Sequence, residues 1–416
     1  AGRPRVASRA SHTVGLAVEM TPGLRRDPAP DLDAVGEDDA LVALIRDEID
    51  RDGPITFARF MELALYDPKG GYYRGDTPRP GRAGDFLTAP EAHPIFGASL
   101  SRAVADTWDR LGRPAPFTVR EAGAGTGTLG VAILDGLRRE RADLAATIRY
   151  QPIEVEQSRL DALAKRFEAS GLAANLDRTT APDSPVDGIV LANEVLDALP
   201  THRVVQRGET LLEVFVATGT DGRFADVEAE PSTPALAARL ESEGVVLVDG
   251  QRAEICLAVD GWVAAVTGGL ARGVALFIDY GYPAGELYDP VRRRDGTLRA
   301  YLRHRVHDDP YIHVGRQDLT AHVDVTAVER AASATGLTHL GTTTQAEFLV
   351  GLGTQDLLQA IQADPATTLE SYLALRSALF RMLDPSAMGR FRVMAFGRGW
   401  PDHEPPLRGL DFRTRR

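Results

Sequence analysis

A glycine-rich stretch is the part of the sequence whose residue types best suit ligand chemistry. Glu121, Gly123, Gly125 and Gly127 follow the β-branched segment FTVR and precede a helical pattern. Glycine permits a tight turn there and lets a ligand approach the backbone without a Cβ in the way. Because Gly125, Gly127 and Gly130 also satisfy G-x-G-x-x-G, the stretch alone fits a dinucleotide as well. It predicts a nucleoside-type cofactor.

Polar side chains at the ends of predicted strands indicate which cofactor the glycine-rich stretch binds. Glu121 stands two residues before the first glycine, where a carboxylate suits the positive amino-acid end of S-adenosylmethionine and repels a pyrophosphate. Glu156 is expected to end the next strand and to accept both ribose hydroxyls, as either cofactor requires. Asn193 and Glu194 follow the buried strand GIVLA, at the carboxyl edge where ligands of such sheets bind. We therefore expect S-adenosylmethionine, with NAD as the rival cofactor.

Strand and helix patterns alternate around these residues. The apolar segments expected to be strands are FTVR, IRYQPIEVEQ, VDGIVLA, GVALFIDYGY and FRVMAFGRG. This alternation predicts an α/β fold with a mostly parallel, doubly wound sheet that carries helices on both faces. An N-terminal helical region and an inserted α+β segment are expected to accompany that sheet.

The chain is expected to divide into five parts. These are a flexible tail at 1–39, N-terminal helices and the active-site loop GDFLTAPE at 40–115, a Rossmann-like core at 116–200 and 251–400, an inserted hairpin and helix at 201–250, and a C-terminal tail at 401–416. The stretch 286–318 is expected to be a long polar loop over the site. We interpret the residues before Met20 as derived from a vector or a start site, although their Arg, Ser and Ala content also suits a transit peptide.

Composition argues against several functional classes. A formal net charge of −12 argues against a nucleic-acid-binding surface. No run of about 20 apolar residues is present, so no membrane span is predicted. The single Cys256 excludes a disulfide within the chain and a thiolate-rich zinc site. The spacing of the histidines between His304 and His322 matches no metal-ligand motif, so no metal is predicted.

Seven separated motifs, in order, resemble those of the MidA family, the mitochondrial complex I assembly methyltransferases and their bacterial relatives. They are FMELALYDPKGGYY, GDFLTAPE, REAGAGTGTLG, NEVLDALP, IDYGY, GTLRAYLRH and QDLTAHVD. The resemblance implies a class I methyltransferase fold, S-adenosylmethionine as cofactor and, in mitochondria, arginine methylation of a complex I subunit. A homodimer is a further expectation from the family. The expected location is the cytoplasm of a bacterium, or the mitochondrial matrix if the source is eukaryotic.

The resemblance also assigns residues by position. Gly123, Gly125 and Gly127 would line the methionine end of the cofactor, and Glu156 would hold the ribose. The walls of the transfer site would come from the motifs GDFLTAPE and NEVLDALP. The residues concerned are Asp85, Phe86, Thr88, Asn193, Glu194 and Asp197. The chain departs from the family pattern by the extension RRERADLAAT and by VDVTAV, where an aromatic residue is expected after HVD.

Methyl transfer is an in-line displacement at a sulfonium methyl, so the protein supplies alignment and a proton acceptor. Glu194 and Asp197 are the first candidates to hold a guanidinium and receive its proton. Alternatively, Asp197 caps a helix and Glu194 touches the cofactor. Asp85 competes for the same role or is simply a turn residue. His322 is a candidate general base, or it only satisfies a hydrogen bond.

The sequence thus predicts an enzyme that transfers a methyl group to an arginine nitrogen of a protein. One alternative, motivated by VDVTAV, is a small-molecule O- or N-methyltransferase of bacterial metabolism. Another is a respiratory-complex assembly factor that acts mainly by binding. An NAD-dependent oxidoreductase is least favoured, because no catalytic dyad accompanies the glycine turn.

Overall fold

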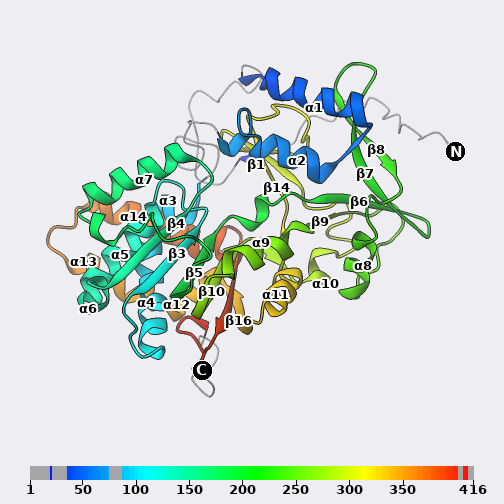
Figure 1. The fold of residues 1–416 in the computed structure, drawn as a ribbon. Coiled ribbons are helices and arrows are strands. Elements are labelled where there is room, and N and C mark those ends of the chain that lie inside the picture. The colour runs from blue at the N-terminus through cyan, green and yellow to red at the C-terminus, as the bar shows by residue number, and fades with distance from the viewer. Residues whose placement is uncertain (1–18, 21–34, 75–86, 402–405, 411–416) are drawn as a thin grey trace. The chain divides into compact units, whose positions relative to one another are not determined.

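The five segments expected to be strands form one sheet together with a sixth strand that was not expected, β16 (Thr338–Thr344) (Figure 1). The computed structural model describes residues 19–20, 35–74, 87–401 and 406–410. Its fold is α/β, as the alternating patterns predict. The chain forms two compact units, each assembled from three segments. Unit 1 comprises Ala1–Leu87, Asp197–Val259 and Tyr282–Thr326, and unit 2 comprises Thr88–Leu196, Asp260–Gly281 and Ala327–Arg416.

Unit 2 contains the six-stranded sheet, in the order β16-β17-β10-β5-β3-β4. Its strands are β3 (Phe117–Ala122), β4 (Ile148–Ile153), β5 (Val186–Asn193), β10 (Leu270–Asp279), β16 (Thr338–Thr344) and β17 (Arg392–Arg398). Neighbouring strands from β4 to β10 pair in parallel, whereas β17 runs antiparallel to both β10 and β16. All six residues of β3 are buried, as expected for a strand covered on both faces.

Helices connect these strands. They are α3 (Ala89–Ala92), α4 (Ile95–Arg110), α5 (Thr128–Glu140), α6 (Ala142–Ala145), α7 (Gln157–Ala169), α9 (Ala258–Thr267), α11 (Val325–Ala334), α12 (Gln345–Gly351), α13 (Thr354–Ala363) and α14 (Leu369–Leu383). Short 3-10 turns occur at η3 (Ala173–Asn175), η4 (Leu196–Ala198) and η5 (Met388–Arg390). In these connections β5 follows α7, and α5 follows the glycine turn directly.

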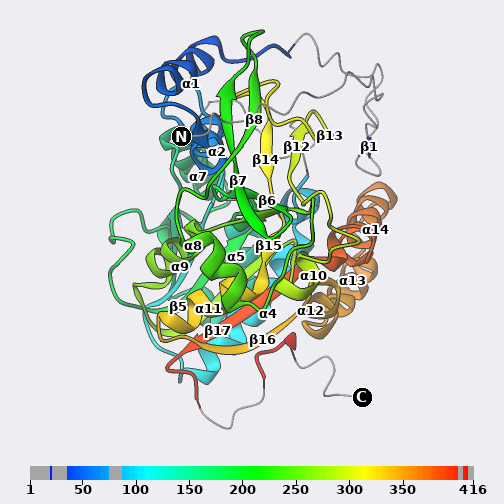
Figure 2. The same ribbon diagram turned by 90° about the vertical axis from the view of Figure 1, so that its right-hand side faces the viewer.

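Unit 1 contains two smaller sheets, in the orders β2-β7-β6-β9, with β8 on β7, and β1-β13-β12-β14. The first uses β2 (Ile55–Thr56), β6 (His202–Arg207), β7 (Thr210–Thr218), β8 (Phe224–Ala229) and β9 (Arg252–Ile255), and Figure 2 shows β6, β7 and β8 as neighbours. The second uses β1 (Glu19–Met20), β12 (Arg299–Leu302), β13 (Arg305–His307) and β14 (Asp318–Thr320). Two further short strands are β11 (Gly281–Tyr282) and β15 (Val323–Asp324).

Helices α1 (Asp39–Asp52) and α2 (Phe57–Tyr66) confirm the N-terminal helical pattern, and their apolar faces join one buried cluster with strand residues of unit 1. The remaining helical segments of unit 1 are η2 (Tyr72–Arg74), α8 (Ala235–Ser242) and α10 (Ala284–Leu287). The tails expected at 1–39 and 401–416 fall largely on residues that the structure does not describe.

Two segments differ from their sequence-based predictions. The segment 201–250 holds the expected hairpin, formed by β6 and β7, and the expected helix α8, but it also contains a third antiparallel strand, β8, that was not expected. The segment 286–318 contains β12 and β13, so it is not one long polar loop. These strands have three or four residues, which is too short for their alternation to stand out among arginines and histidines. Segment 282–326 also groups with unit 1, whereas we expected it within the core.

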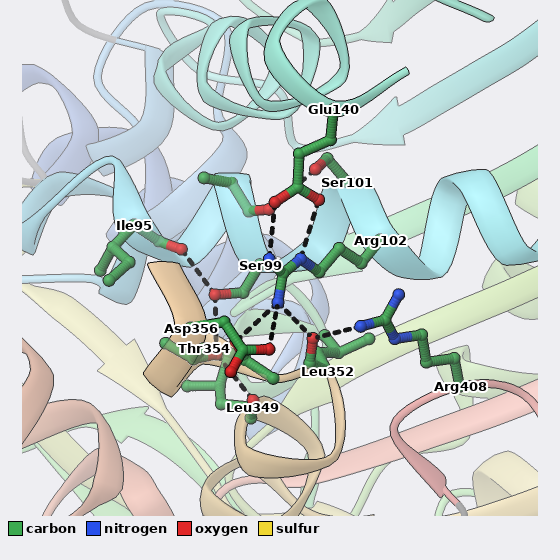
Figure 3. Close-up of polar contacts among 12 residues, drawn as sticks. Ile95, Ser99, Ser101, Arg102, Glu140, Leu349, Leu352, Thr354, Asp356 and Arg408 are labelled. Carbon is green, nitrogen blue, oxygen red and sulfur yellow. Dashed lines mark hydrogen bonds and ion pairs between the residues drawn. The ribbon is translucent and has the colours of Figure 1, made fainter. Parts of the chain in front are cut away.

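Arg102 links three parts of unit 2 (Figure 3). From α4, its Nε and Nη2 donate to the two carboxylate oxygens of Glu140 at 2.8 and 2.6 Å. Its Nη1 donates to the carbonyl oxygens of Leu352 at 3.0 Å and Gly353 at 2.6 Å. Because only 10% of the Arg102 side chain is exposed, these contacts are weakly screened by solvent. They fix the turn after α12 against α4 and the end of α5.

Replacement of Arg102 by Ala should lower the free energy of unfolding of unit 2 by about 2–3 kcal/mol, because a partly buried carboxylate and two carbonyls lose their donors. Trp108, Trp262 and Trp400 all lie in unit 2, so tryptophan fluorescence during urea denaturation reports on this unit. The control is Arg178→Ala, which removes a surface pair at 3.4 Å and should change stability by less than about 0.5 kcal/mol. Equal losses in both variants would contradict the stabilising role of Arg102.

Candidate active site

The glycine turn between β3 and α5 adopts a backbone conformation that L side chains rarely take. The φ angles of Gly123, Gly125 and Gly127 are +67°, +52° and +78°. A Cβ added at Gly123 would lie 2.6 Å from Val195 Cγ2, and one at Gly127 would lie 2.7 Å from Leu163 Cγ. A Cβ at Gly125 would have no atom within 4 Å. Two glycines are therefore required for packing, while the third leaves its backbone facing open space.

A carboxylate that sequence reasoning missed adjoins this turn. The amide of Gly125 donates to Glu154 Oε2 at 2.9 Å, and Glu154 Oε1 accepts from the amides of Val155 at 2.9 Å and Glu156 at 3.2 Å. Only 4% of the Glu154 side chain is exposed. Glu154 therefore joins the end of β4 to the glycine turn.

The prediction that Glu156 ends a strand is wrong. Strand β4 ends at Ile153, and Glu156 is the N-cap of α7, where its Oε1 accepts from Ser158 N at 3.4 Å. The segment IEVEQ has glutamates two residues apart, and the apolar Val155 between them made the strand look longer than it is. An earlier strand end would have identified Glu154 first. A role of Glu156 at the ribose stays a prediction.

Glu121 lies at the end of β3 and is buried, with 4% of its surface exposed. Tyr150 Oη on β4 donates to Glu121 Oε2 at 2.6 Å. Burial raises the pKa of Glu121 to about 8, because it disfavours the charged carboxylate; the Tyr150 hydrogen bond acts in the opposite direction and the negative charge of Glu154 adds to the rise. At neutral pH this carboxyl therefore holds its proton for most of the time.

The end of β5 presents Asn193 and Glu194 as one hydrogen-bonded unit. Glu194 Oε1 accepts from Asn193 Nδ2 at 2.9 Å and from the amide of Ala89 at 3.1 Å. Glu194 has φ +55°, an uncommon value for a residue with a Cβ. Asn193 Oδ1 is buried and accepts no hydrogen bond from any described residue. An acceptor is therefore available at the carboxyl edge of β5.

Asp279 at the end of β10 fixes the loop that follows β5. It is fully buried, and its Oδ2 accepts from the amides of Val195 at 3.1 Å and Leu196 at 2.8 Å. Its Oδ1 accepts from the amide of Tyr280 at 2.8 Å. The motif IDYGY contained this residue, but nothing in the sequence indicated that it would bind backbone amides 83 and 84 residues away.

The short helix α3 is attached to the same edge of the sheet. Thr88 is its N-cap, without a hydrogen bond from its side chain. Glu91 Oε1 accepts from Thr128 Oγ1 at 2.7 Å, and Thr128 is the first residue of α5. Sequence reasoning missed both Glu91 and Thr128. Asp85 and Phe86, which it did select, lie outside the described residues.

Two other selected residues belong to unit 1. Asp197 is buried, with 7% of its surface exposed, and its carbonyl accepts from the amide of Ala321 at 2.9 Å. The ring of His322 stacks on Tyr282 with centroids 5.6 Å apart, and its amide donates to Thr297 Oγ1 at 3.1 Å. Glu194 belongs to unit 2, so its joint action with Asp197 stays a prediction.

The described residues contain neither a metal-binding cluster nor a membrane-spanning helix. Among them, no group of three or more His, Cys, Asp or Glu side chains is arranged to hold a metal ion. None of their helices has the length and hydropathy needed to cross a bilayer.

Comparisons with known proteins identify the family. Residues 99–343 match the sequence profile of a family described as S-adenosyl-L-methionine-dependent methyltransferases. The mitochondrial protein arginine methyltransferase NDUFAF7 homolog of Drosophila melanogaster is 30% identical over 86% of this chain and 84% of its own length. The chain belongs to this methyltransferase family. These matches confirm the resemblance to the MidA family and identify the protein as a methyltransferase that uses S-adenosylmethionine.

Two further similarities extend over most of the methyltransferase. The human mitochondrial protein arginine methyltransferase NDUFAF7 is 28% identical over 84% of this chain and 81% of its own length. A crystal structure from Burkholderia thailandensis, bound to S-adenosyl-homocysteine, is 35% identical and superposes with a TM-score of 0.81. It covers 92% of this chain and 97% of the Burkholderia chain.

The edge of the sheet in unit 2 suits S-adenosylmethionine chemically. The backbone at Gly125 faces open space, so an adenosyl ligand can approach it closely. The buried acceptor Asn193 Oδ1 and the carboxylate of Glu154 suit a ligand that carries an ammonium, a sulfonium and ribose hydroxyls. The residues present therefore fit the cofactor of the family.

Replacement of Glu121 by Gln should stabilise the methyltransferase increasingly as the pH rises from 4.5 towards 8. The ordinary pKa of this group is 4.5, against about 8 in the folded protein. Between these values the unfolded chain loses the proton and the folded chain keeps it. The contribution of Glu121 to the free energy of unfolding of the wild type therefore falls with rising pH. The fall is at most about 1.4 kcal/mol per pH unit.

Calorimetric melting from pH 4.5 to 8.5 measures this effect as the difference in Tm between the variant and the wild type. Glu168→Gln, at an exposed position on α7, is the control for loss of one carboxyl. A difference for Glu121→Gln that stays constant across the range would contradict a protonated Glu121.

Proposed function

We propose that this methyltransferase transfers the methyl group to an arginine nitrogen of a protein. The observation that carries the proposal is the similarity to the fly and human proteins, which extends over more than four-fifths of each of them. Both are named protein arginine methyltransferases. The carboxylate of Glu194, which directly follows β5, also supports arginine as the methyl acceptor. A guanidinium binds a carboxylate in a forked geometry.

We propose that the cofactor lies along Gly123, Gly125 and Gly127, with Glu121 near its positive amino-acid end. Asn193 and Thr88 are the other proposed contacts. For the ribose hydroxyls we prefer Glu154 to Glu156. Glu154 adjoins the amide of Gly125, whereas Glu156 is the N-cap of α7.

The bound cofactor supplies an electrophilic methyl on a sulfonium, and the protein's residues act on the acceptor. In the proposed reaction an N–C bond forms as the C–S bond breaks, and the acceptor nitrogen loses one proton. Glu194, Asp197 and Asp85 are the proposed carboxylates that orient the guanidinium, and His322 is a further proposed base. A carboxylate holds a guanidinium in line through two parallel hydrogen bonds, which favours one attack direction.

We also infer that the sheet of unit 2 is the doubly wound sheet of class I methyltransferases. Its strand order, its parallel neighbours from β4 to β10 and its antiparallel β17 support this inference. A bacterial cytoplasmic location and a homodimer stay predictions. The curated relatives quoted above are named mitochondrial, so the matrix is the corresponding prediction for a eukaryotic source.

Isothermal titration should give tight binding of S-adenosylmethionine and S-adenosylhomocysteine and no binding of NAD. Gly125→Val should reduce adenosyl binding at least about 100-fold, because the side chain would enter the space that the ligand approaches. The matched control is Gly208→Val, since Gly208 has φ +57° and equally open space but lies in the β6–β7 turn of unit 1. Loss of binding in both variants would contradict the site.

Arginine-bearing peptides and a panel of small amines and phenols then test the acceptor. Incubation with labelled cofactor followed by mass spectrometry should locate the added methyl on an arginine nitrogen. Methylation only of the small molecules would contradict the protein acceptor and favour the metabolic alternative.

A further inference from the structure

Glu194 occupies a backbone position that the surrounding structure imposes. Its φ of +55° is one that residues other than glycine adopt at a free-energy cost. Its amide donates to the carbonyl of Ile278 at 2.8 Å, and Asp279 holds the amides of the next two residues. The backbone of Glu194 is therefore fixed on both sides, and this directs its side chain along the end of β5.

The carboxylate of Glu194 determines which way the Asn193 amide faces. A carboxylate can only accept hydrogen bonds, so the nitrogen of Asn193, and not its oxygen, must face Glu194. The distance from Nδ2 to Glu194 Oε1 is 2.9 Å. This contact leaves Asn193 Oδ1 buried and without a hydrogen bond from the described residues. A donor on a bound ligand can therefore use this acceptor without displacing a described residue.

The position of Asn193 indicates what that donor is. Strands β3 and β5 pair so that Ala122 lies opposite Ala192, and Asn193 and Gly123 are the residues that follow them. Val195 packs so closely on Gly123 that a Cβ there would lie 2.6 Å from it. Asn193 is therefore a neighbour of the first glycine of the turn. Under the proposed binding mode, the amino-acid end of the cofactor lies there.

We propose that Glu194 is a positioning residue that presets Asn193 Oδ1 to accept a hydrogen bond from the cofactor's α-ammonium. This assignment rests on the proposed cofactor site and gives Glu194 a role other than proton acceptor. Through its contact with the amide of Ala89, the same carboxylate attaches α3 to the end of β5. Removal of Glu194 frees the Asn193 amide to rotate, so part of the affinity for the amino-acid end is lost.

A double-mutant cycle on the whole chain tests this role. The dissociation constant of S-adenosylhomocysteine is measured by titration for the wild type, Glu194→Ala, Asn193→Ala and the double variant. We expect each single variant to bind about tenfold more weakly, as for a hydrogen bond to a charged group. If Glu194 acts through Asn193, the double variant should be no weaker than the weaker single variant. Losses that multiply in the double variant would overturn the proposal.

5′-Methylthioadenosine, which lacks the amino-acid end, separates positioning from a general structural effect. Its affinity should change less than about threefold in the same variants, because it offers no ammonium to Asn193. An equal loss for both ligands would overturn the proposal.

Three further variants separate the carboxylate from the backbone. Glu194→Gln keeps an oxygen that can accept both hydrogen bonds and should bind S-adenosylhomocysteine within about threefold of wild type. Glu194→Gly relieves the positive φ and should still bind as weakly as Glu194→Ala; wild-type affinity there would show that only strain matters. Glu329→Ala, a carboxylate that faces His339 at 3.4 Å, should leave affinity unchanged. A wild type that binds no S-adenosylhomocysteine would reject the cofactor site itself, a result distinct from multiplying losses.

Discussion

Backbone amides at the carboxyl edge of the sheet need acceptors once the strands stop pairing, and carboxylates supply them. Glu154 accepts from Gly125, Asp279 from Val195, and Glu194 from Ala89. These contacts hold the glycine turn, the loop after β5 and α3 in one arrangement. They also gather acidic groups at the edge where we propose that the positively charged cofactor binds, so in that proposal one set of side chains serves both the fold and the ligand.

Burial limits the negative charge at this edge through one further acid, Glu121. Glu121 keeps its proton because burial raises its pKa to about 8, so it adds little negative charge to an edge that already holds Glu154. The hydroxyl of Tyr150 donates to Glu121 Oε2 at 2.6 Å and orients that oxygen. Methyl transfer removes one positive charge from the cofactor. In the proposed site, an acidic edge is therefore more complementary to S-adenosylmethionine than to S-adenosylhomocysteine.

The sequence predicted the features that depend on neighbouring residues. The glycine turn, the buried strands and the family could be recognised because their signals are local. Glu154 was overlooked in favour of Glu156, because the end of β4 could not be placed within IEVEQ from hydropathy alone. Asp279 and Glu91 were missed since their partners are distant in sequence and are largely backbone amides or a lone hydroxyl. Strands β12 and β13 were missed because segments of three or four residues show too little alternation.

The location of β17 has a consequence for synthesis of the protein. This strand follows every other strand in the sequence, yet it lies inside the sheet, between β10 and β16. While the ribosome is still producing the chain, β10 has an unpaired edge and β16 has no neighbour to join. The sheet can close only after residues 392–398 have left the exit tunnel. The nascent protein therefore exposes the edge of β10 until late in translation, and unpaired strand edges of this kind favour aggregation.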